Sequence, residues 1–165
     1  MSPLSVLLFL LFLLLSFPTP GDTLTTNFTF TGQLFCHLNR TFSYVVEIIE
    51  EDITEASDDV ISGVHYHGGV RSPVYYQVFG QDSGDGPFDF YYEIALLIHH
   101  DCITDLWYSE TTVKAIRVPI GSYSILHGAY RKVINFDITD EGIASNWPQL
   151  DDVDYPDGSD SDFNS

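Results

Sequence analysis

Basic residues are scarce in this chain of 165 residues, which has only 6 Lys and Arg against 24 Asp and Glu. The formal net charge is -18 at pH 7. Sequence-independent binding to nucleic acid requires clustered Lys and Arg side chains that neutralise phosphates, so this scarcity argues against nucleic acid as a partner. It also opposes charge-driven docking on anionic membranes. The length provides for one domain of ordinary size and leaves little room for a second.

Cysteine is also scarce, since the chain has only Cys36 and Cys102. Two cysteines at this separation do not form a closed zinc site. In an oxidising compartment they have a single intramolecular pairing, which would close a loop of about 67 residues and stabilise the fold by roughly 4 kcal/mol on the chain-entropy model. Two buried free thiols are the alternative.

The N-terminal apolar run, residues 4–17, holds about 14 residues, fewer than the roughly 20 that a membrane-spanning helix needs. Pro18 ends the run, and small or turn-forming residues follow as far as Gly21. This layout is typical of a secretory signal peptide. We therefore expect a signal peptide at residues 1–21, with cleavage after Ser16 as the competitor, and no transmembrane segment in the mature chain. An uncleaved anchor helix is the alternative.

Two acceptor triplets for N-linked glycans follow soon after this segment. Asn27 begins the triplet Asn-Phe-Thr, and Asn39 begins the triplet Asn-Arg-Thr. Both match the Asn-x-Ser/Thr pattern without proline in the middle. Together with the signal peptide they predict a secreted, extracellular glycoprotein.

Helical periodicity is missing along the chain, and a period of two takes its place. Between Phe28 and Cys36 the even positions are mostly apolar, and the odd positions from Asn27 to Gln33 are polar, which predicts a strand with one buried and one solvated face. Asn27 falls on the solvated face, where a glycan would not disturb the core. Gly32 falls on the buried face, which indicates a bulge or a close approach of another backbone.

Turn signals separate this strand from others of similar length. The short polar segment 37–40 favours a hairpin, Gly68 and Gly69 indicate a turn, and Pro119 is expected to end a strand. Further strands are expected near residues 42–50, 61–66, 70–79, 94–102, 111–118 and 130–138. The sequence thus predicts an all-β fold, an antiparallel β-sandwich of about seven strands over residues 22–139.

The composition changes after Thr139. Residues 140–165 contain no Lys or Arg and hold eight of the acids: Asp140, Glu141, Asp151, Asp152, Asp154, Asp157, Asp160 and Asp162. Such a segment buries too little apolar surface to offset the entropy of ordering it. We therefore expect a disordered acidic tail.

Candidate metal ligands are few and poorly spaced. Asp58 and Asp59 lie in an acidic stretch, but a calcium loop requires acids at alternate positions and a central glycine, so a solvated loop is the preferred interpretation. His65 and His67 would share a face of a strand, as two ligands of a transition metal do, but no third ligand is identifiable. We predict neither a metal nor a cofactor.

The segment His99, His100 and Asp101 is the one arrangement that invites a catalytic interpretation. His100 shares its strand face with Ile98 and Cys102, so we expect its ring to point inward and bond to backbone groups. The chain has no Gly-x-Ser-x-Gly elbow and no zinc-protease motif. We expect no catalytic residue, and the protein is not expected to be an enzyme.

Several of these elements together resemble the nematode transthyretin-like secreted proteins, over roughly residues 26–139. The matching pieces are Gly32-x-Leu34-x-Cys36, the acidic loop with Asp58-Asp59, Leu96-x-Ile98-x-His100-Asp101-Cys102, Val118-Pro119 followed by Tyr123, and the closing strand Tyr130 to Ile138. The resemblance implies a secreted transthyretin-like β-sandwich without general enzymatic activity. It also implies an extracellular protein or a cell-surface receptor as partner.

The resemblance brings three further possibilities. One branch of the family bridges exposed phosphatidylserine and an engulfment receptor, which makes phospholipid a possible partner, although each surface cation adds only about 1 kcal/mol to such binding. A small-ligand carrier for hydrophobic or lipid molecules would require a tetramer channel, which the sequence does not show. A related hydrolase of purine breakdown relies on a terminal Tyr-Arg-Gly-Ser motif, whereas this chain ends Asp-Ser-Asp-Phe-Asn-Ser. We predict a secreted binding or signalling protein.

Overall fold

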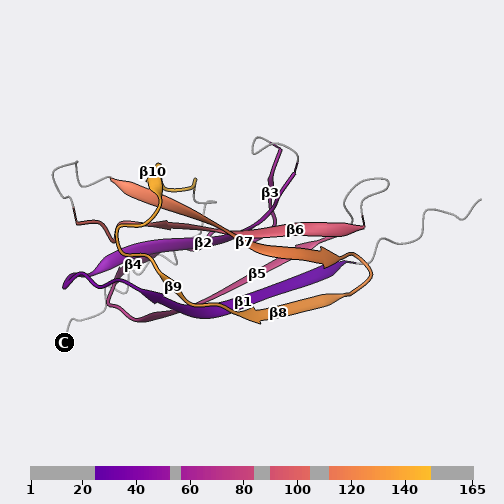
Figure 1. Ribbon diagram of the computed structural model, residues 1–165, viewed down its shortest axis with the longest axis horizontal. Helices are drawn as coiled ribbons and strands as arrows, with labels where there is room; N and C mark the ends of the chain where they lie inside the picture. The colour runs from indigo at the N-terminus through magenta and orange to yellow at the C-terminus, as the bar shows by residue number, and fades with distance from the viewer. Residues whose placement is uncertain (1–24, 53–56, 84–89, 105–111, 150–165) are drawn as a thin grey trace, which may run out of the picture.

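The computed structural model of the protein describes residues 25–52, 57–83, 90–104 and 112–149. These residues form ten β-strands and no helix, which confirms the expected all-β fold (Figure 1). The strands are β1 (Thr26–Phe35), β2 (Phe42–Glu50), β3 (Asp59–Val60), β4 (His67–Val70), β5 (Val74–Asp82), β6 (Tyr91–His100), β7 (Val113–Ser124), β8 (Ala129–Val133), β9 (Phe136–Asp137) and β10 (Ile143–Ser145). In the described ranges, no helix is long and apolar enough to cross a membrane.

The strands form two sheets that face each other as the layers of a sandwich (Figure 1). Sheet A has the order β5-β1-β8, and β9 also pairs with β1. Sheet B has the order β10-β7-β6-β2-β3, and β4 also pairs with β2. The pairings are antiparallel, as expected, except that β1 runs parallel to both β8 and β9. The strand count exceeds seven because β3, β4, β9 and β10 are short.

The core lies between the sheets and follows the predicted alternation. In β1 the inward row is Phe28, Phe30, Gly32 and Leu34, and its three large side chains are almost fully buried. The Phe28 ring meets the ring of Tyr92 from β6 edge to face, with centroids 5.5 Å apart. Each such apolar side chain contributes about 1.5–3 kcal/mol through burial, so this row anchors sheet A to sheet B.

Gly32 marks a close approach of two backbones, as expected from its place on the buried face. A Cβ atom at this position would lie 1.7 Å from the carbonyl oxygen of Ile134, which follows the end of β8. That oxygen accepts a hydrogen bond from the Tyr76 hydroxyl at 2.8 Å, and the Ile134 N–H donates to the carbonyl of Thr31 at 2.8 Å. Glycine is therefore required where the chain passes from β8 to β9.

The expected hairpin at residues 37–40 is wrong, because β1 and β2 belong to different sheets. The segment instead carries the chain from sheet A to sheet B. Cys36 and Cys102, which follow the ends of β1 and β6, form the expected disulfide across the same end of the sandwich, with Cα atoms 6.0 Å apart. A short polar connection has the same local signature in a hairpin and in a crossing between layers, so the sequence alone could not separate the two.

Two other turn signals fall inside strands. Gly68 and Gly69 belong to β4, and the positive φ of Gly69 (66°) accompanies a register shift against β2. The turn that follows β4 instead contains the cis peptide bond between Ser72 and Pro73. Pro119 does not end β7, because it lies beside a bulge in the pairing with β6 and beyond the short stretch of β7 that pairs with β10. Its missing N–H is tolerated at such a position.

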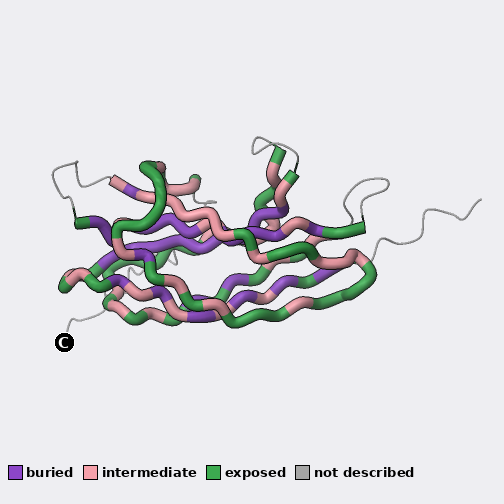
Figure 2. Tube along the Cα trace, in the orientation of Figure 1, coloured by how far each residue is buried: buried purple, intermediate pink, exposed green. Residues whose placement is uncertain are grey.

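Strand β2 is buried along its whole length, on both faces (Figure 2). Its outward residues include Val45, Glu47 and Ile49, all of which are almost fully buried. The C-terminal strap, which we define as residues 143–149, begins at β10 and continues over the outer face of the same sheet. The Asn146 carbonyl bonds to a side chain on β6, and the Trp147 ring lies 5.2 Å from the ring of Tyr66 near the β2 edge of the sheet.

The strap corrects the domain boundary at Thr139. β10 pairs with β7 through Ile143, Ala144 and Ser145, so the folded domain continues into the segment that composition predicted to be disordered. Positive φ angles at Asp140 (59°) and Gly142 (86°) turn the chain from sheet A toward sheet B. Composition missed this because β10 joins the sheet by backbone pairing at the free edge of β7, which requires no buried side chains, and Ile143 stays 77% exposed. Residues 1–24 and 150–165, where the signal peptide and the rest of the tail were expected, lie outside the described residues.

Candidate functional site

The outer face of sheet A is open to solvent and differs in character from the rest of this acidic protein. Its central strand β1 presents the odd-numbered row of the predicted alternation, which includes Thr29, Thr31 and Gln33. The outward row of β5 is Tyr75, Gln77 and Phe79, because Tyr76 and Val78 point into the core. Side chains of β5 and β8 therefore flank this central row of β1 on either side.

A trough follows this central row. One hollow, of about 400 Å³, and a second, of about 590 Å³, share Thr31, Gln77 and Val133 and so are continuous. We call them together the sheet A trough, lined by Thr29, Thr31 and Gln33 on its floor, Tyr75, Gln77 and Phe79 along β5, and Arg131, Val133 and Asn135 along the other side. Its volume falls in the range of small-molecule binding sites.

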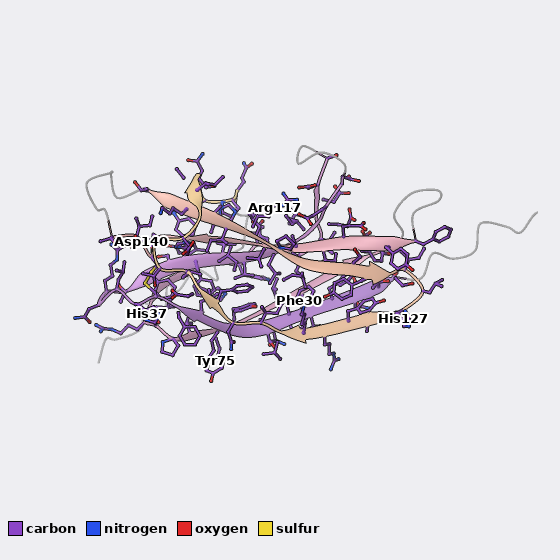
Figure 3. The ribbon with its side chains drawn as sticks, in the orientation of Figure 1. Phe30, His37, Tyr75, Arg117, His127 and Asp140 are labelled. Carbon is purple, nitrogen blue, oxygen red and sulfur yellow. A yellow bond between two sulfur atoms is a disulfide. The ribbon has the colours of Figure 1, made fainter. Side chains whose placement is uncertain are left out.

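Large apolar side chains in the trough are strongly exposed. Tyr75 is 76% exposed, Phe79 60% and Val133 76%. Figure 3 shows Tyr75 projecting from sheet A away from the other layer, while Arg117 lies on the opposite side of the molecule beyond sheet B. Exposed apolar side chains that gather on one face of a protein mark an interaction site more often than isolated ones do.

Among the described residues, those that line the trough include no Asp or Glu, although the chain carries 24 of them. The charged side chain that faces the trough is Arg131, whereas the Lys132 ammonium group reaches toward sheet B and donates to the Ile120 carbonyl of β7 at 3.2 Å. Asn135 is held in place at the rim because its Oδ1 accepts the N–H of Gln33 at 2.9 Å. The trough thus offers hydroxyl and carboxamide groups, aromatic rings and a cation.

The outer face of sheet B carries a different chemistry. His99 Nδ1 lies 3.0 Å from the Asn146 carbonyl, which can only accept, so Nδ1 carries a proton. The other ring nitrogen lies 3.3 Å from the carboxylate of Glu47, and both side chains are almost fully buried. The arrangement fixes the C-terminal strap to β6.

Asp58, one of the two acids considered as cation ligands, is paired with a cation of the protein itself. Its carboxylate lies 2.7 Å from the Arg117 guanidinium, which also lies 2.7 Å from Glu51. The hydrogen bond from Arg117 lowers the pKa of Asp58, and the same bond raises the pKa of Arg117. Asp59 is exposed in β3. This arrangement is an ion-pair network that holds the loop after β2 against β7.

His65 and His67 do not share the face of one strand. His67 begins β4, where its ring stacks on Tyr44 with centroids 4.8 Å apart, whereas His65 precedes the strand. Burial lowers the pKa of His67, and the nearby His65 lowers it further. Within the described residues, no three His, Cys, Asp or Glu side chains gather in a way that would hold a metal ion.

His100 points into the core, as the alternation predicted. Its side chain has no solvent-exposed surface, and its Nδ1 accepts the N–H of Cys102 at 3.2 Å. Burial lowers the pKa of His100 to about 4. A substrate in solution has no direct access to this ring, so the arrangement of His99, His100 and Asp101 serves packing and backbone contacts.

The buried His100 makes the stability of the fold depend on pH. The unfolded side chain titrates near pH 6.5, whereas the folded one stays neutral down to about pH 4. As the pH falls through this window, the unfolded state binds a proton that the folded state does not. We expect a loss of about 2 kcal/mol in unfolding free energy between about pH 7.5 and pH 5. Urea unfolding at a series of pH values should show this slope.

The matched variant is His100→Asn, whose carboxamide oxygen can accept the Cys102 N–H but does not titrate. Its stability profile should be flatter than that of the wild type by the same amount, although its absolute stability is lower. Parallel profiles for the two proteins would show that His100 does not carry the pH dependence.

Both predicted glycan acceptors are exposed. Asn27 lies on the outer face of sheet A, two residues before Thr29, and its side-chain amide donates to the Gly128 carbonyl at 3.2 Å. Asn39 is exposed in the connection between β1 and β2. Exposure is necessary for a glycan but does not show one, so glycosylation at both positions stays a prediction, as do secretion and the signal peptide.

Sequence reasoning did not find the trough. Its lining comes from three segments that are distant along the chain, and their alignment depends on the register of β1 with β5 and β8. One signal was present: Tyr75 and Phe79 alternate with the core residues Tyr76 and Val78, so β5 has apolar side chains on both faces. Because sheet A is covered on its inner side alone, such a strand leaves aromatic rings in solvent.

Comparisons with known proteins give one distant relative. The chain is 26% identical over 110 residues to an uncharacterized protein of Caenorhabditis elegans, an alignment that covers 66% of this chain and 79% of the relative. No protein-family model matches the chain, and no solved structure matches it. Any functional assignment therefore depends on the residues and geometry of this molecule.

Proposed function

We propose that the protein is a secreted, non-enzymatic binding protein that acts at extracellular surfaces, and that the sheet A trough is its ligand-binding face. The observation that carries the proposal is the trough itself, where the strongly exposed Tyr75, Phe79 and Val133 gather on a face whose lining lacks carboxylates. Large exposed aromatic side chains are the usual anchors of binding surfaces. In an acidic protein, a trough whose described lining has no carboxylate is a surface suited to contact.

Other features support an extracellular site of action. The apolar run at residues 4–17, the triplets at Asn27 and Asn39, and the disulfide between Cys36 and Cys102 each agree with export to an oxidising compartment. His100, which was considered as a catalytic residue, lies in the core, and Asp58, which was considered as a cation ligand, is paired with Arg117. Both side chains therefore have structural roles. Recognition is therefore the function that the described residues support best.

A single substitution on the trough floor tests this proposal. Thr31 points outward from the centre of β1 and lines both hollows, so Thr31→Arg should fill the trough without entering the core. We expect the variant to bind cells of the organism that encodes the protein at least about tenfold more weakly than the wild type. The measurement is saturation binding of the labelled, secreted protein.

The matched control is Ser122→Arg, which adds the same charge at an exposed position of β7 in sheet B. It should bind cells like the wild type. Equal binding by all three proteins would refute the trough as the binding face, and the absence of saturable binding by the wild type would count against the function as a whole.

A further inference from the structure

We infer that the sheet A trough binds a neutral oligosaccharide of about three sugar units, an inference that rests on the proposed function and names its ligand class. The first argument is shape. The floor from Thr29 to Gln33 follows four residue steps of β1, about 13 Å at the usual rise of a strand. The two hollows along it hold about 400 and 590 Å³. A trough of this length and volume suits a short linear ligand.

The second argument is the chemistry of the lining. Carboxamides of Gln33, Gln77 and Asn135 each provide donors and acceptors, as do the hydroxyls of the floor. Sugar hydroxyls also donate and accept, so the two sets of groups are complementary. The rings of Tyr75 and Phe79 offer flat apolar surface against which the C–H face of a sugar ring can pack.

The third argument is charge. The trough is lined without carboxylates, so it has no group that attracts a cationic ligand. The chain as a whole carries a formal charge of -18, which repels a polyanion at long range. An uncharged ligand needs no carboxylate partner and is not repelled by the net negative charge. The guanidinium of Arg131 can still donate to its hydroxyl oxygens.

The position of the trough favours a sugar over a peptide strand as its ligand. Peptides commonly bind sheets by adding a strand at an edge, where backbone groups are free. The trough instead lies over β1, whose backbone pairs with β5 on one side and with β8 and β9 on the other. A ligand there meets side-chain hydroxyls, carboxamides and rings, which suit a polyol better than a peptide backbone.

The test is calorimetric titration of the full-length, oxidised protein with three neutral probes: the β-1,4-linked N-acetylglucosamine trimer, cellotriose and maltotriose. All proteins carry Asn27→Gln, so that no glycan attached two residues from Thr29 competes for the trough. We expect at least one trimer to bind saturably with one site per chain. A sulfated heparin tetrasaccharide serves as the polyanion control and should bind more weakly.

Two matched pairs of variants locate the site. Phe79→Ala should weaken binding about tenfold, whereas Phe90→Ala should not, although Phe79 is 60% and Phe90 59% exposed. Gln77→Ala should also weaken binding, whereas Gln81→Ala, further along the same face of β5 but outside the trough lining, should not. Equal effects within either pair would overturn the inference.

Failure of this inference can be distinguished from failure of the proposed function. If no trimer binds and enzymatic removal of cell-surface glycans leaves cell binding intact, the sugar assignment is wrong while the binding function stands. Preferential binding of the heparin fragment would likewise overturn the neutral assignment. If a trimer binds as expected but the protein shows no saturable binding to cells, the trough is a sugar site and the cell-surface function is wrong.

Discussion

Replacing Gly32 with alanine is expected to lower the unfolding free energy by about 3 kcal/mol. The added Cβ would lie 1.7 Å from the Ile134 carbonyl oxygen and 3.0 Å from the Tyr76 ring. No rotamer relieves such a contact, because one partner is backbone. The segment between β8 and β9 must therefore move, which disturbs the Tyr76 hydrogen bond to Ile134 and the pairing beside the trough floor.

Gly128→Ala is the matched control, because a Cβ at Gly128 meets nothing within 4 Å. Urea unfolding monitored by tyrosine and tryptophan fluorescence should show this variant within a few tenths of a kcal/mol of the wild type. Equal stability of the two alanine variants would mean that the close approach at Gly32 does not exist.

Removing the disulfide is expected to have the largest effect on stability. Cys36 and Cys102 are separated by 66 residues, and cross-linking a loop of this size stabilises a fold by roughly 4 kcal/mol on the chain-entropy model. The double variant Cys36→Ser/Cys102→Ser should lose about that amount, because the connection from β1 to β2 is no longer tied to the end of β6. The measurement is again the midpoint and slope of urea unfolding.

A reducing agent provides the internal control for the disulfide. It should destabilise the wild type to about the level of the double serine variant and leave that variant unchanged. Insensitivity of the wild type to reduction, with an intact mass that corresponds to two free thiols, would show that the bridge does not form in the protein.

The sequence was most informative where the physics is local. The alternation from Phe28 to Leu34 correctly separated a buried row from an exposed row, and it placed Gly32 at a backbone contact. The same alternation correctly predicted that the His100 side chain points into the core. A period of two depends only on strand geometry, so it can be identified without knowing the partner strands.

The errors have a common origin in non-local pairing. The segment 37–40 crosses between sheets, and Gly69 sits within a strand, because partners distant in sequence decide both outcomes. Pro119 remains inside β7 since the neighbouring bulge tolerates it. The C-terminal strap was missed because the backbone of β10 pairs with β7 and Trp147 meets Tyr66, contacts that exist only in the folded molecule. The trough was missed for the same reason, since no local pattern gives the register of β5 and β8 against β1.

The central claim is that the sheet A trough contacts the extracellular partner, and hydroxyl-radical footprinting of free and cell-bound protein tests it most directly. The readout is the oxidation of four strongly exposed side chains: Tyr75 and Phe79 in the trough, and Phe90 and Leu126 outside it. The predicted result is lower oxidation of Tyr75 and Phe79 in the cell-bound protein, with unchanged oxidation of Phe90 and Leu126. Unchanged oxidation of Tyr75 and Phe79 in the bound protein would contradict the claim.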